Sequence, residues 1–265
     1  MVETDRFKHS TPALYDRYMG PLLFAPYANY VAKRTALLQP TRILETAAGS
    51  GIVTAAIHAS VPEADIVATD INSAMLEFAA HRVRSDGVTF QVADAQNLPF
   101  TDGSFDLVVC QFGAMFFPDR VRANQEAWRV LRSGGSYLLL SFDRLERNVV
   151  PRAAGDAVAA LFPDDPPMYL ERGPFCYSDP DLIKRDLLKG GFTHIELETV
   201  ALSSHVTAHD AAQGIVLGSP FRAEIERRDP SALDRALHTV TQALARWDGK
   251  NAPMSAHVAT AKKMS

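Results

Sequence analysis

The 265-residue sequence lacks several features that would assign it to special classes of protein. It has no apolar run of the roughly 20 residues that span a bilayer, and its polar N-terminus contains no apolar core of a secretory signal. Its two cysteines, Cys110 and Cys176, form no CxxC pair, so neither a disulfide framework nor a zinc site is indicated. Low-complexity tracts and repeats are also missing. We expect a cytoplasmic protein with no membrane span and no bound metal.

Basic residues are not in excess. The sequence contains 27 Lys and Arg against 31 Asp and Glu, which gives a formal net charge of -4. Nucleic-acid-binding domains usually carry a basic surface, so we expect no nucleic-acid partner. Hydrophobic residues make up 47% of the chain, and a chain of this length can bury roughly 75% of its unfolded surface.

Strand-like and helix-like stretches alternate between Arg42 and Phe142. Strand-like runs are RILET, ADIVATD, VTFQVAD, FDLVVCQF and SYLLLSF, and between them lie the helix-like runs GIVTAAIHASV, NSAMLEFAAHRVRS and DRVRANQEAWRVL. Asn72 or Ser73 and then Asp119 are suited to cap the second and third helices, and the third is expected to end at the SGG that follows it. This alternation predicts a parallel sheet with helices on both faces.

The flanking regions have a different composition. Residues 1–40 are rich in aromatic side chains and predict one or two helices, whereas a proline-rich stretch follows Phe142. Asp179 and Pro180 begin a further helix that closes at two glycines. HIELETVAL predicts a sixth strand, residues 208–247 predict helices, and SAHVATAKK predicts a last short strand. No flexible linker separates these parts, so we expect one domain.

The segment ILETAAGSG joins the first predicted strand to its helix, and Gly49 and Gly51 allow a ligand to approach its backbone closely. Asp70 ends the next strand, about 20 residues further on, where an acid can bind both hydroxyl groups of a ribose. These features alone fit a nicotinamide cofactor or any other cofactor that contains adenosine.

Three further residues distinguish between these cofactors. Thr54 replaces the third glycine of a dinucleotide fingerprint. Glu45, just before the turn, would repel a pyrophosphate and suits a cationic amino group. Asp94 follows the third strand, where it can accept a hydrogen bond from the amino group of adenine. Since the carboxyl ends of parallel strands share one edge of the sheet, the three acids predict a ligand with an amine, a diol and an adenine, and without phosphate.

Five segments in this order and spacing resemble the class I S-adenosylmethionine-dependent methyltransferases, specifically the type 11 group that includes ubiquinone and menaquinone C-methyltransferases. They are ILETAAGSG, ATDINSAML, VADAQNLPF, FDLVVCQFGAMFFPD and VLRSGGSYLLLSF. The resemblance implies a Rossmann-like, doubly wound, mostly parallel sheet of seven strands with helices on both faces. Residues 1–265 would form a single methyltransferase domain. Residues 1–40 would be an N-terminal helical lid, residues 41–142 the cofactor-binding core, and residues 143–265 the cap insertions and last two strands.

The resemblance also implies S-adenosyl-L-methionine as cofactor and S-adenosyl-L-homocysteine as product. The implied cofactor residues lie at the strand ends and the turns that follow them: Glu45, Ala47, Gly49, Gly51, Asp70, Ile71, Met75, Asp94, Ala95 and Gln111.

Particular roles follow from the matching positions. Ala47, Gly49 and Gly51 would face the methionine part, although the family commonly has glycine at Ala47. Ile71 and Met75 would pack against adenine and ribose. Each position also has a purely structural interpretation.

Among the structural interpretations, the acids could cap helices or turns, and Ile71 and Met75 could be ordinary core residues.

Two further cofactor contacts are implied by the resemblance. At Gln111 the resemblance implies that the backbone carbonyl meets the cofactor's amino group. At Ala95 it implies a contact with the edge of adenine, shared with Asp94.

The acceptor is less well defined by the sequence. Aromatic residues that could line its pocket are Tyr15, Tyr18, Phe112 and Phe116. A base is needed only if the acceptor loses a proton, and the candidates at the same sheet edge are Asp143, His205 and His209. The apolar and aromatic flanks favour a small, largely apolar acceptor, methylated by in-line displacement, and a monomer or homodimer.

Three other functions are alternatives for a sequence with these features. A short-chain nicotinamide oxidoreductase would need a Tyr-x-x-x-Lys pair, which the sequence does not contain. Enzymes that methylate the amino group of adenine in nucleic acids carry an Asn/Asp-Pro-Pro-aromatic tetrad after the fourth strand, where this sequence has QFGAMFFPD. A non-catalytic module that binds S-adenosylmethionine is left open by the sequence.

Overall fold

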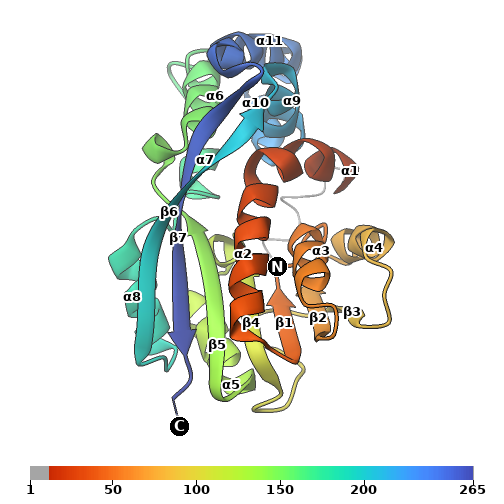
Figure 1. Cartoon of the computed structure of the whole chain (residues 1–265). Coiled ribbons are helices and arrows are strands. Elements are labelled where there is room, and N and C mark those ends of the chain that lie inside the picture. Colours follow the sequence, from red (N-terminus) through yellow and green to blue (C-terminus); the bar gives the residue numbers. More distant parts are fainter. Residues whose placement is uncertain (1–11, 265) are drawn as a thin grey trace. The chain divides into compact units, whose positions relative to one another are not determined.

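The structure is a computed structural model that describes residues 12–264 (Figure 1). The chain divides into two compact units. Within the described residues, unit 1 comprises 12–26, 144–176 and 201–255, and unit 2 comprises 27–143, 177–200 and 256–264. Two long strands, β6 (His194–Val206) and β7 (Lys250–Lys262), have residues in both units. The single domain expected for residues 1–265, with its divisions after residues 40 and 142, stays a prediction.

The central element is a sheet of seven strands. Its other strands are β1 (Arg42–Thr46), β2 (Asp65–Asp70), β3 (Val88–Val92), β4 (Phe105–Gln111) and β5 (Leu131–Phe142). The order across the sheet is β3-β2-β1-β4-β5-β7-β6. The strands β1 to β5 pair in parallel, and β7 pairs antiparallel with β5. The predicted doubly wound, mostly parallel seven-stranded sheet is therefore confirmed. Its strand order reverses between β1 and β4, where ligands bind to open α/β sheets.

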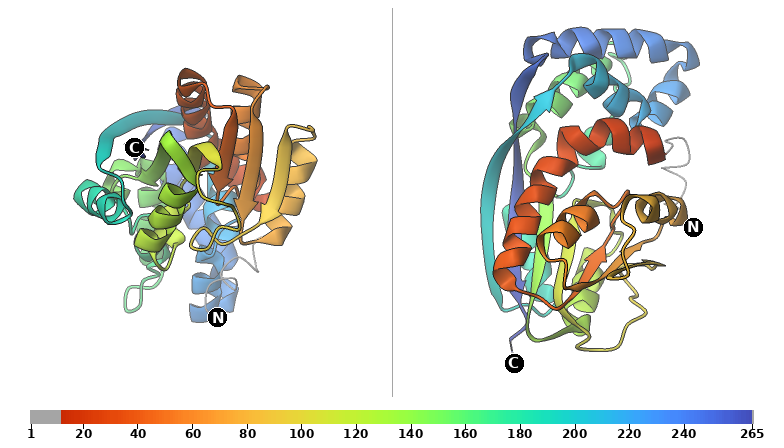
Figure 2. Two further views of the ribbon diagram at one scale, coloured as in Figure 1. Left: turned by 90° about the horizontal axis from the view of Figure 1, so that it is seen from below. Right: turned by 45° about the vertical axis from the view of Figure 1, so that its right-hand side comes forward.

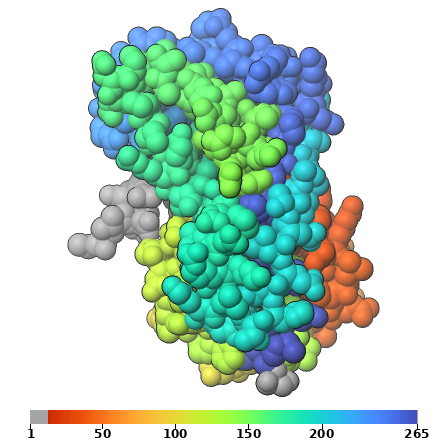
Figure 3. Space-filling view, turned by 90° about the vertical axis from the view of Figure 1, so that its left-hand side faces the viewer, coloured from red at the N-terminus to blue at the C-terminus, as the bar shows by residue number. Residues whose placement is uncertain are grey.

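Helices cover both faces of this sheet in unit 2 (Figures 1 and 2). One face carries α2 (Ala25–Leu38), α3 (Ile52–Ser60) and α4 (Ser73–Arg82), and the other carries α5 (Arg120–Val130) and α8 (Pro180–Lys189). The crossovers from β1 through β3 run in one direction and the crossover from β4 to β5 runs in the other. Right-handed connections therefore place their helices on opposite faces. Figure 3 views unit 2 from the side of α8, with the edge strand β6 beside it.

Local sequence signals set the helix starts. The Asn72 side chain accepts hydrogen bonds from the backbone of Ala74 and Met75 at the start of α4. Asp119 caps α5, and Asp179 caps α8 with Pro180 in the first turn. A short polar side chain satisfies backbone N–H groups that have no partner within the helix. The predicted caps at Asn72, Asp119 and Asp179 are confirmed.

Three predicted boundaries are wrong. The helix α5 ends at Val130 rather than at the SGG of residues 133–135, because the chain joins strand β5 from Leu131 onward. The strands β6 and β7 each have 13 residues and exceed the predicted HIELETVAL and SAHVATAKK. Their extra residues belong to unit 1, and pairing between two long strands extends them beyond the apolar pattern that marked their cores.

Unit 1 is mainly helical. Its elements are α1 (Pro12–Leu14), η1 (Tyr15–Phe24), η3 (Leu145–Arg147), α6 (Val149–Ala159), α7 (Tyr169–Arg172), α9 (Ala208–Ala212), η4 (Gln213–Leu217), α10 (Phe221–Arg228), η5 (Pro230–Ala232), α11 (Leu233–Leu244) and η6 (Ala245–Trp247). The helix α11 packs on α6 and α9. Helices were predicted for 208–247, and the structure confirms them. None of the helices between residues 12 and 264 combines the length and the apolar character that crossing a membrane requires.

Candidate cofactor site

The turn after β1 contains three residues with a left-handed backbone. The φ angles are +54° at Ala47, +54° at Gly49 and +77° at Gly51. An alanine in this conformation costs roughly 1–2 kcal/mol. Room for the Ala47 side chain exists because its neighbour is Gly113, where an added Cβ would lie only 2.4 Å from the Ala47 Cβ. The absence of a side chain at Gly113 therefore explains how the turn accommodates alanine at a position where the resembling family commonly has glycine.

Glu45 lies near the carboxyl end of β1, and only 2% of its surface is exposed. Thr54 on α3 donates a hydrogen bond to Glu45 Oε2 at 2.6 Å. Burial raises the pKa of Glu45 to about 8, the Thr54 hydrogen bond opposes this rise, and the charge of Asp70 adds to it. A perturbed acid at the end of a parallel strand is typical of a functional site, and a cationic partner would favour its ionised form.

Asp70 ends β2 and connects the turn to the start of α4. Its Oδ2 accepts a hydrogen bond from the Gly49 N–H at 2.9 Å, and its Oδ1 accepts one from the Asn72 N–H at 2.9 Å. Burial raises the pKa of Asp70, and the backbone N–H groups oppose the rise. The carboxyl group is thus held at the same edge of the sheet as Glu45, since β1 and β2 are neighbours.

Two apolar side chains follow Asp70. Ile71 is 58% exposed, whereas Met75 on α4 is 6% exposed. An exposed isoleucine beside a held carboxyl group offers a surface for a flat apolar ring, and Met75 is a core residue by its burial. The contribution of both to adenine binding stays a prediction.

Asp94 lies two residues beyond β3 and forms a local turn. Its Oδ1 accepts hydrogen bonds from the backbone and the side-chain nitrogen of Gln96, at 2.8 and 3.1 Å. Ala95 beside it is half-buried. The turn-forming role that the sequence left open for Asp94 is therefore present. Its role in binding adenine, with Ala95, stays a prediction.

An ion-pair cluster fixes the loop that follows Asp94. Arg129 on α5 donates to the carbonyl groups of Leu98 and Phe100 at 2.9 and 2.7 Å. Its guanidinium group also pairs with Glu126 at 2.8 Å, and this glutamate accepts the Leu98 N–H at 2.8 Å. Hydrogen bonding to Arg129 holds the pKa of Glu126 below its usual range. The cluster joins α5 to the loop that carries Asp94.

Aromatic rings pack at the carboxyl ends of β4 and β5. Phe112 has a left-handed backbone with φ of +57°. Its ring stacks on Phe142 with centroids 3.8 Å apart, and Tyr27 meets it edge-on at 5.3 Å. Phe112 is 6% exposed and Gln111 before it is also buried. The structure thus gives Phe112 a packing role within unit 2, while Phe116 on η2 (Ala114–Phe116) is half-buried. Their contribution to an acceptor pocket stays a prediction.

The three candidate bases differ in their surroundings. Asp143 follows β5, and its Oδ1 lies 3.3 Å from Nε2 of His257 on β7. His257 is buried and also contacts the Ser178 carbonyl group and the Thr199 hydroxyl group, both at 3.0 Å. His205 and His209 are exposed residues of unit 1. Asp143 is the candidate that contacts a buried histidine, and this contact orients its carboxyl group.

The aromatic residues of η1 pack within unit 1. Tyr15 stacks on Phe24 with ring centroids 5.2 Å apart. Tyr18 lies under the Arg17 guanidinium group at 5.1 Å, and its Cβ lies 3.0 Å from the position of a Cβ added at Gly214 on η4. This packing explains why the helix contains so many aromatic residues. The proposed lid and the place of Tyr15 and Tyr18 near a sulfonium stay predictions.

The structure adds two partners to the residues expected from the sequence. Thr54 replaces the third fingerprint glycine, and its hydroxyl group on the first turn of α3 reaches the acid near the end of β1. His257 lies in a predicted strand, and its partner Asp143 is distant in sequence. The first partnership has a local signal in the nine-residue separation of Glu45 and Thr54, and the second has none.

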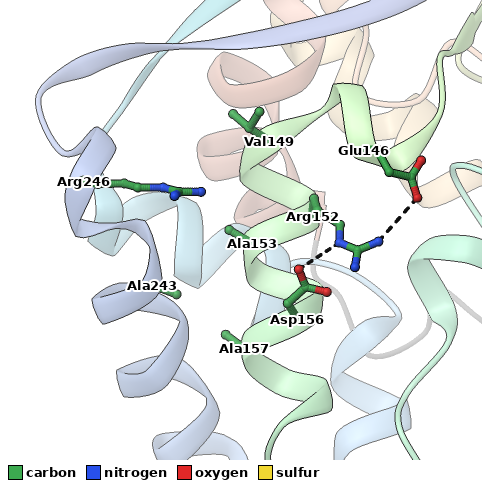
Figure 4. A pocket seen from close by; sticks show the side chains of 8 residues that line it. All are labelled: Glu146, Val149, Arg152, Ala153, Asp156, Ala157, Ala243 and Arg246. Atoms are coloured by element: carbon green, nitrogen blue, oxygen red, sulfur yellow. Dashed lines mark hydrogen bonds and ion pairs between the residues drawn. The ribbon is translucent and has the colours of Figure 1, made fainter.

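A separate concave surface lies in unit 1 between α6 and α11 (Figure 4). Its apolar part consists of Val149 and the alanines of both helices, and at its edge Arg152 pairs with Asp156 at 2.8 Å and with Glu146 at 3.4 Å. No predicted site residue lines it. Between residues 12 and 264, no group of three or more His, Cys, Asp and Glu side chains is arranged to hold a metal ion.

The region that contains the strand-end acids and the turn between them is similar in sequence to known methyltransferases. Residues 44–139 match a family model described as a methyltransferase domain. The demethylmenaquinone methyltransferase of Deinococcus radiodurans is 36% identical over 105 residues, which cover 39% of this chain and 44% of that protein. The ubiquinone/menaquinone biosynthesis C-methyltransferase UbiE of Pseudomonas aeruginosa is 27% identical over 225 residues, which cover 78% and 84%. The chain spans about half the length of the first curated relatives it matches.

Solved structures share the fold. The YcgJ protein from Bacillus subtilis is 19% identical with a TM-score of 0.57, covering 90% of this chain and 99% of that chain. The Haemonchus contortus phosphoethanolamine N-methyltransferase 2, in complex with phosphomonomethylethanolamine and S-adenosylhomocysteine, is 17% identical with a TM-score of 0.62, covering 100% and 59%. The solved structures show that the chain shares their fold. Residues 44–139 form a methyltransferase domain similar to that of the ubiquinone and menaquinone C-methyltransferases.

Proposed function

We propose that this chain is an S-adenosylmethionine-dependent methyltransferase that transfers a methyl group to a small, largely apolar acceptor by in-line displacement. The observation that carries the proposal is the pair of acids, Glu45 and Asp70, at the ends of neighbouring parallel strands. They flank a turn with a left-handed backbone, and burial raises the pKa of both. The matched methyltransferase domain contains both acids.

Several features support the fit between this cofactor and the residues. The buried Glu45 carboxyl group gains from a cationic amino group, and Asp70 is held where a ribose diol can donate to it. A Cβ at Gly49 would meet no atom of the described residues within 4 Å, so a ligand can approach the backbone there. Ile71 offers apolar surface beside Asp70. In this assignment, Asp94 and Ala95 contact the edge of adenine, and the Gln111 carbonyl group accepts from the amino group.

The chemical demands on the chain are modest. When bound, S-adenosylmethionine supplies a methyl group that its positive sulfur already activates. The chain holds the acceptor in line with that methyl group, and such positioning supplies on the order of 7–11 kcal/mol. Aromatic faces near the sulfonium add roughly 0.5–2 kcal/mol by cation–π contact. We assign this role to Tyr15, Tyr18, Phe112 and Phe116.

The acceptor class rests on the apolar flanks and on the relatives. Relatives named for demethylmenaquinone and for ubiquinone and menaquinone support a small, largely apolar acceptor. Where the acceptor loses a proton, Asp143 is the group we assign to take it, with His257 orienting its carboxyl group at 3.3 Å. We further propose a cytoplasmic monomer or homodimer that acts without a nucleic-acid partner.

Calorimetry and an acceptor screen test this function. The folded protein should bind S-adenosylhomocysteine with micromolar affinity and should not bind NAD. Radiolabelled S-adenosylmethionine, offered with a panel of quinones, phenols and amines, should transfer its label to one class. A folded protein that binds no S-adenosylhomocysteine would contradict the proposal. A protein that binds S-adenosylhomocysteine but transfers no methyl group to any acceptor would favour a non-catalytic module.

A further inference from the structure

The Glu45 carboxyl group has one hydrogen-bond partner among residues 12–264, the hydroxyl group of Thr54. The donor and acceptor oxygens are 2.6 Å apart. Thr54 is 0% exposed and Glu45 is 2% exposed, so bulk water does not compete for this bond. The bond fixes Oε2 and leaves Oε1 to accept from a ligand.

The position of Thr54 suits this task. It lies in the first turn of α3, which begins at Ile52 directly after the left-handed turn. The backbone of this turn also supplies the Gly49 N–H that holds Asp70. Thr54 therefore connects the carboxyl end of β1 to the same turn that orients the second acid.

We infer that Thr54 is a positioning residue that orients the Glu45 carboxyl group and favours its carboxylate form, so that Oε1 accepts a hydrogen bond from the cationic amino group of the cofactor. The inference rests on the proposed function, because it assigns the amino group to S-adenosylmethionine or its product. Burial of Glu45 makes binding of the amino group depend on pH, and the Thr54 hydrogen bond opposes this effect because it lowers the pKa of Glu45.

The charges around Glu45 support this linkage. Burial raises the pKa of Glu45 to about 8, so the carboxyl group is mostly protonated at pH 7 before a ligand binds. An ammonium group at hydrogen-bonding distance favours the carboxylate form. Asp70 on β2 is the charged group that acts on Glu45, and its like charge also favours the protonated form. Binding of the amino group then requires the loss of about one proton.

The first test compares two ligands on the wild-type protein. S-adenosylhomocysteine carries the amino group, whereas 5′-methylthioadenosine shares the adenine and ribose but lacks the amino acid. Between pH 6 and 7.5 the association constant of the former should rise about tenfold per pH unit, since one proton is released. That of the latter should change little, which also controls for titration of Asp70. Calorimetry in buffers of different ionisation heat should report proton release with the first ligand only.

The second test uses two substitutions at one site. Thr54→Val keeps the shape of the side chain and removes the donor, so the affinity for S-adenosylhomocysteine at pH 7 should fall about tenfold, equivalent to about one unit of pKa. The affinity for 5′-methylthioadenosine should stay the same. Thr54→Ser restores the hydroxyl group and should restore both the affinity and its pH profile.

The outcomes separate this inference from the proposed function. If the wild-type protein binds S-adenosylhomocysteine without pH dependence or proton release, the inference is wrong and the function stands. Equal weakening of both ligands by Thr54→Val, or full binding by that variant, also overturns it. If neither ligand binds at any pH, the proposed function itself fails. If Thr54→Val does not fold, the absence of proton release by the wild-type protein would still overturn the inference.

Discussion

Alanine substitutions at Gly51 and Gly49 should differ in effect: the first should mainly lower stability and the second should mainly weaken ligand binding. Both glycines have a left-handed backbone, with φ of +77° and +54°. A Cβ at Gly51 would lie 2.8 Å from the Cβ of Ala79 on α4 and 3.2 Å from its Cα, whereas a Cβ at Gly49 would meet no described atom within 4 Å. Ala79 is fully buried, so α4 must shift to admit the extra atom at Gly51.

The structure gives the size of the two effects. At either position the left-handed conformation of alanine costs roughly 1–2 kcal/mol. At Gly51 the overpacking against Ala79 adds about 1–3 kcal/mol. For a chain of this length, Gly51→Ala should lower Tm by roughly 4–20 °C and Gly49→Ala by roughly 2–8 °C. In ligand binding the order should reverse, because the added Cβ at Gly49 extends toward the proposed ligand.

Thermal unfolding and calorimetry with S-adenosylhomocysteine measure both effects on the same samples. The expected result is a larger fall in Tm for Gly51→Ala and a larger loss of affinity for Gly49→Ala. A Gly51→Ala variant as stable as the wild type would refute the packing argument. A Gly49→Ala variant with unchanged affinity would place the ligand away from this turn.

Four further predictions concern the charged residues and the N-terminal segment. Because the folded pKa of Glu45, about 8, exceeds its ordinary value of 4.5, the folded state binds more protons between these values; the ligand-free Tm should therefore fall from pH 5 to 8. Glu45→Gln should reduce this slope, and equal slopes would contradict the argument. Arg129→Ala leaves the buried Glu126 carboxylate with Arg122, at 3.3 Å, as its remaining guanidinium partner and should cost about 2–4 kcal/mol in denaturant unfolding; a loss within experimental error would count against the cluster. Asp70→Asn should weaken S-adenosylhomocysteine binding by about 10–100-fold, through the loss of charge-assisted hydrogen bonds worth roughly 1.5–3 kcal/mol each, and unchanged affinity would remove Asp70 from the site. Deletion of residues 1–24 spares Tyr27, which is buried and bonded to the Val200 carbonyl group; if the segment is a lid, the shortened protein should fold and bind the product poorly, and normal binding would rule the lid out.

The features of the fold that depend on local sequence were predictable. The caps at Asn72, Asp119 and Asp179 use a side chain and backbone groups two or three residues apart. The alternation of strands and helices reflects periodicity within short windows. Both signals are complete within a few residues, so tertiary contacts did not alter them.

The features that depend on distant residues were not predictable in the same way. The end of α5 at Val130 is set by pairing of the following residues in the sheet. The contact of Asp143 with His257 joins residues more than a hundred positions apart. The tolerance of Ala47 for a left-handed backbone depends on Gly113, in the loop after β4. For the site, the strand-end acids could be predicted because topology brings them together, and Thr54 has a local signal in its nine-residue separation from Glu45. The contact of Asp143 with His257 has no such signal.

A crystal structure of the protein with S-adenosylhomocysteine would test the proposed site at the ends of β1 and β2 directly. We expect the amino nitrogen of the ligand within hydrogen-bonding distance of Glu45 Oε1. We also expect both ribose hydroxyl groups on the Asp70 carboxylate and the adenine ring against Ile71. A ligand bound elsewhere, or one whose amino group lies away from Glu45, would show that this site is wrong.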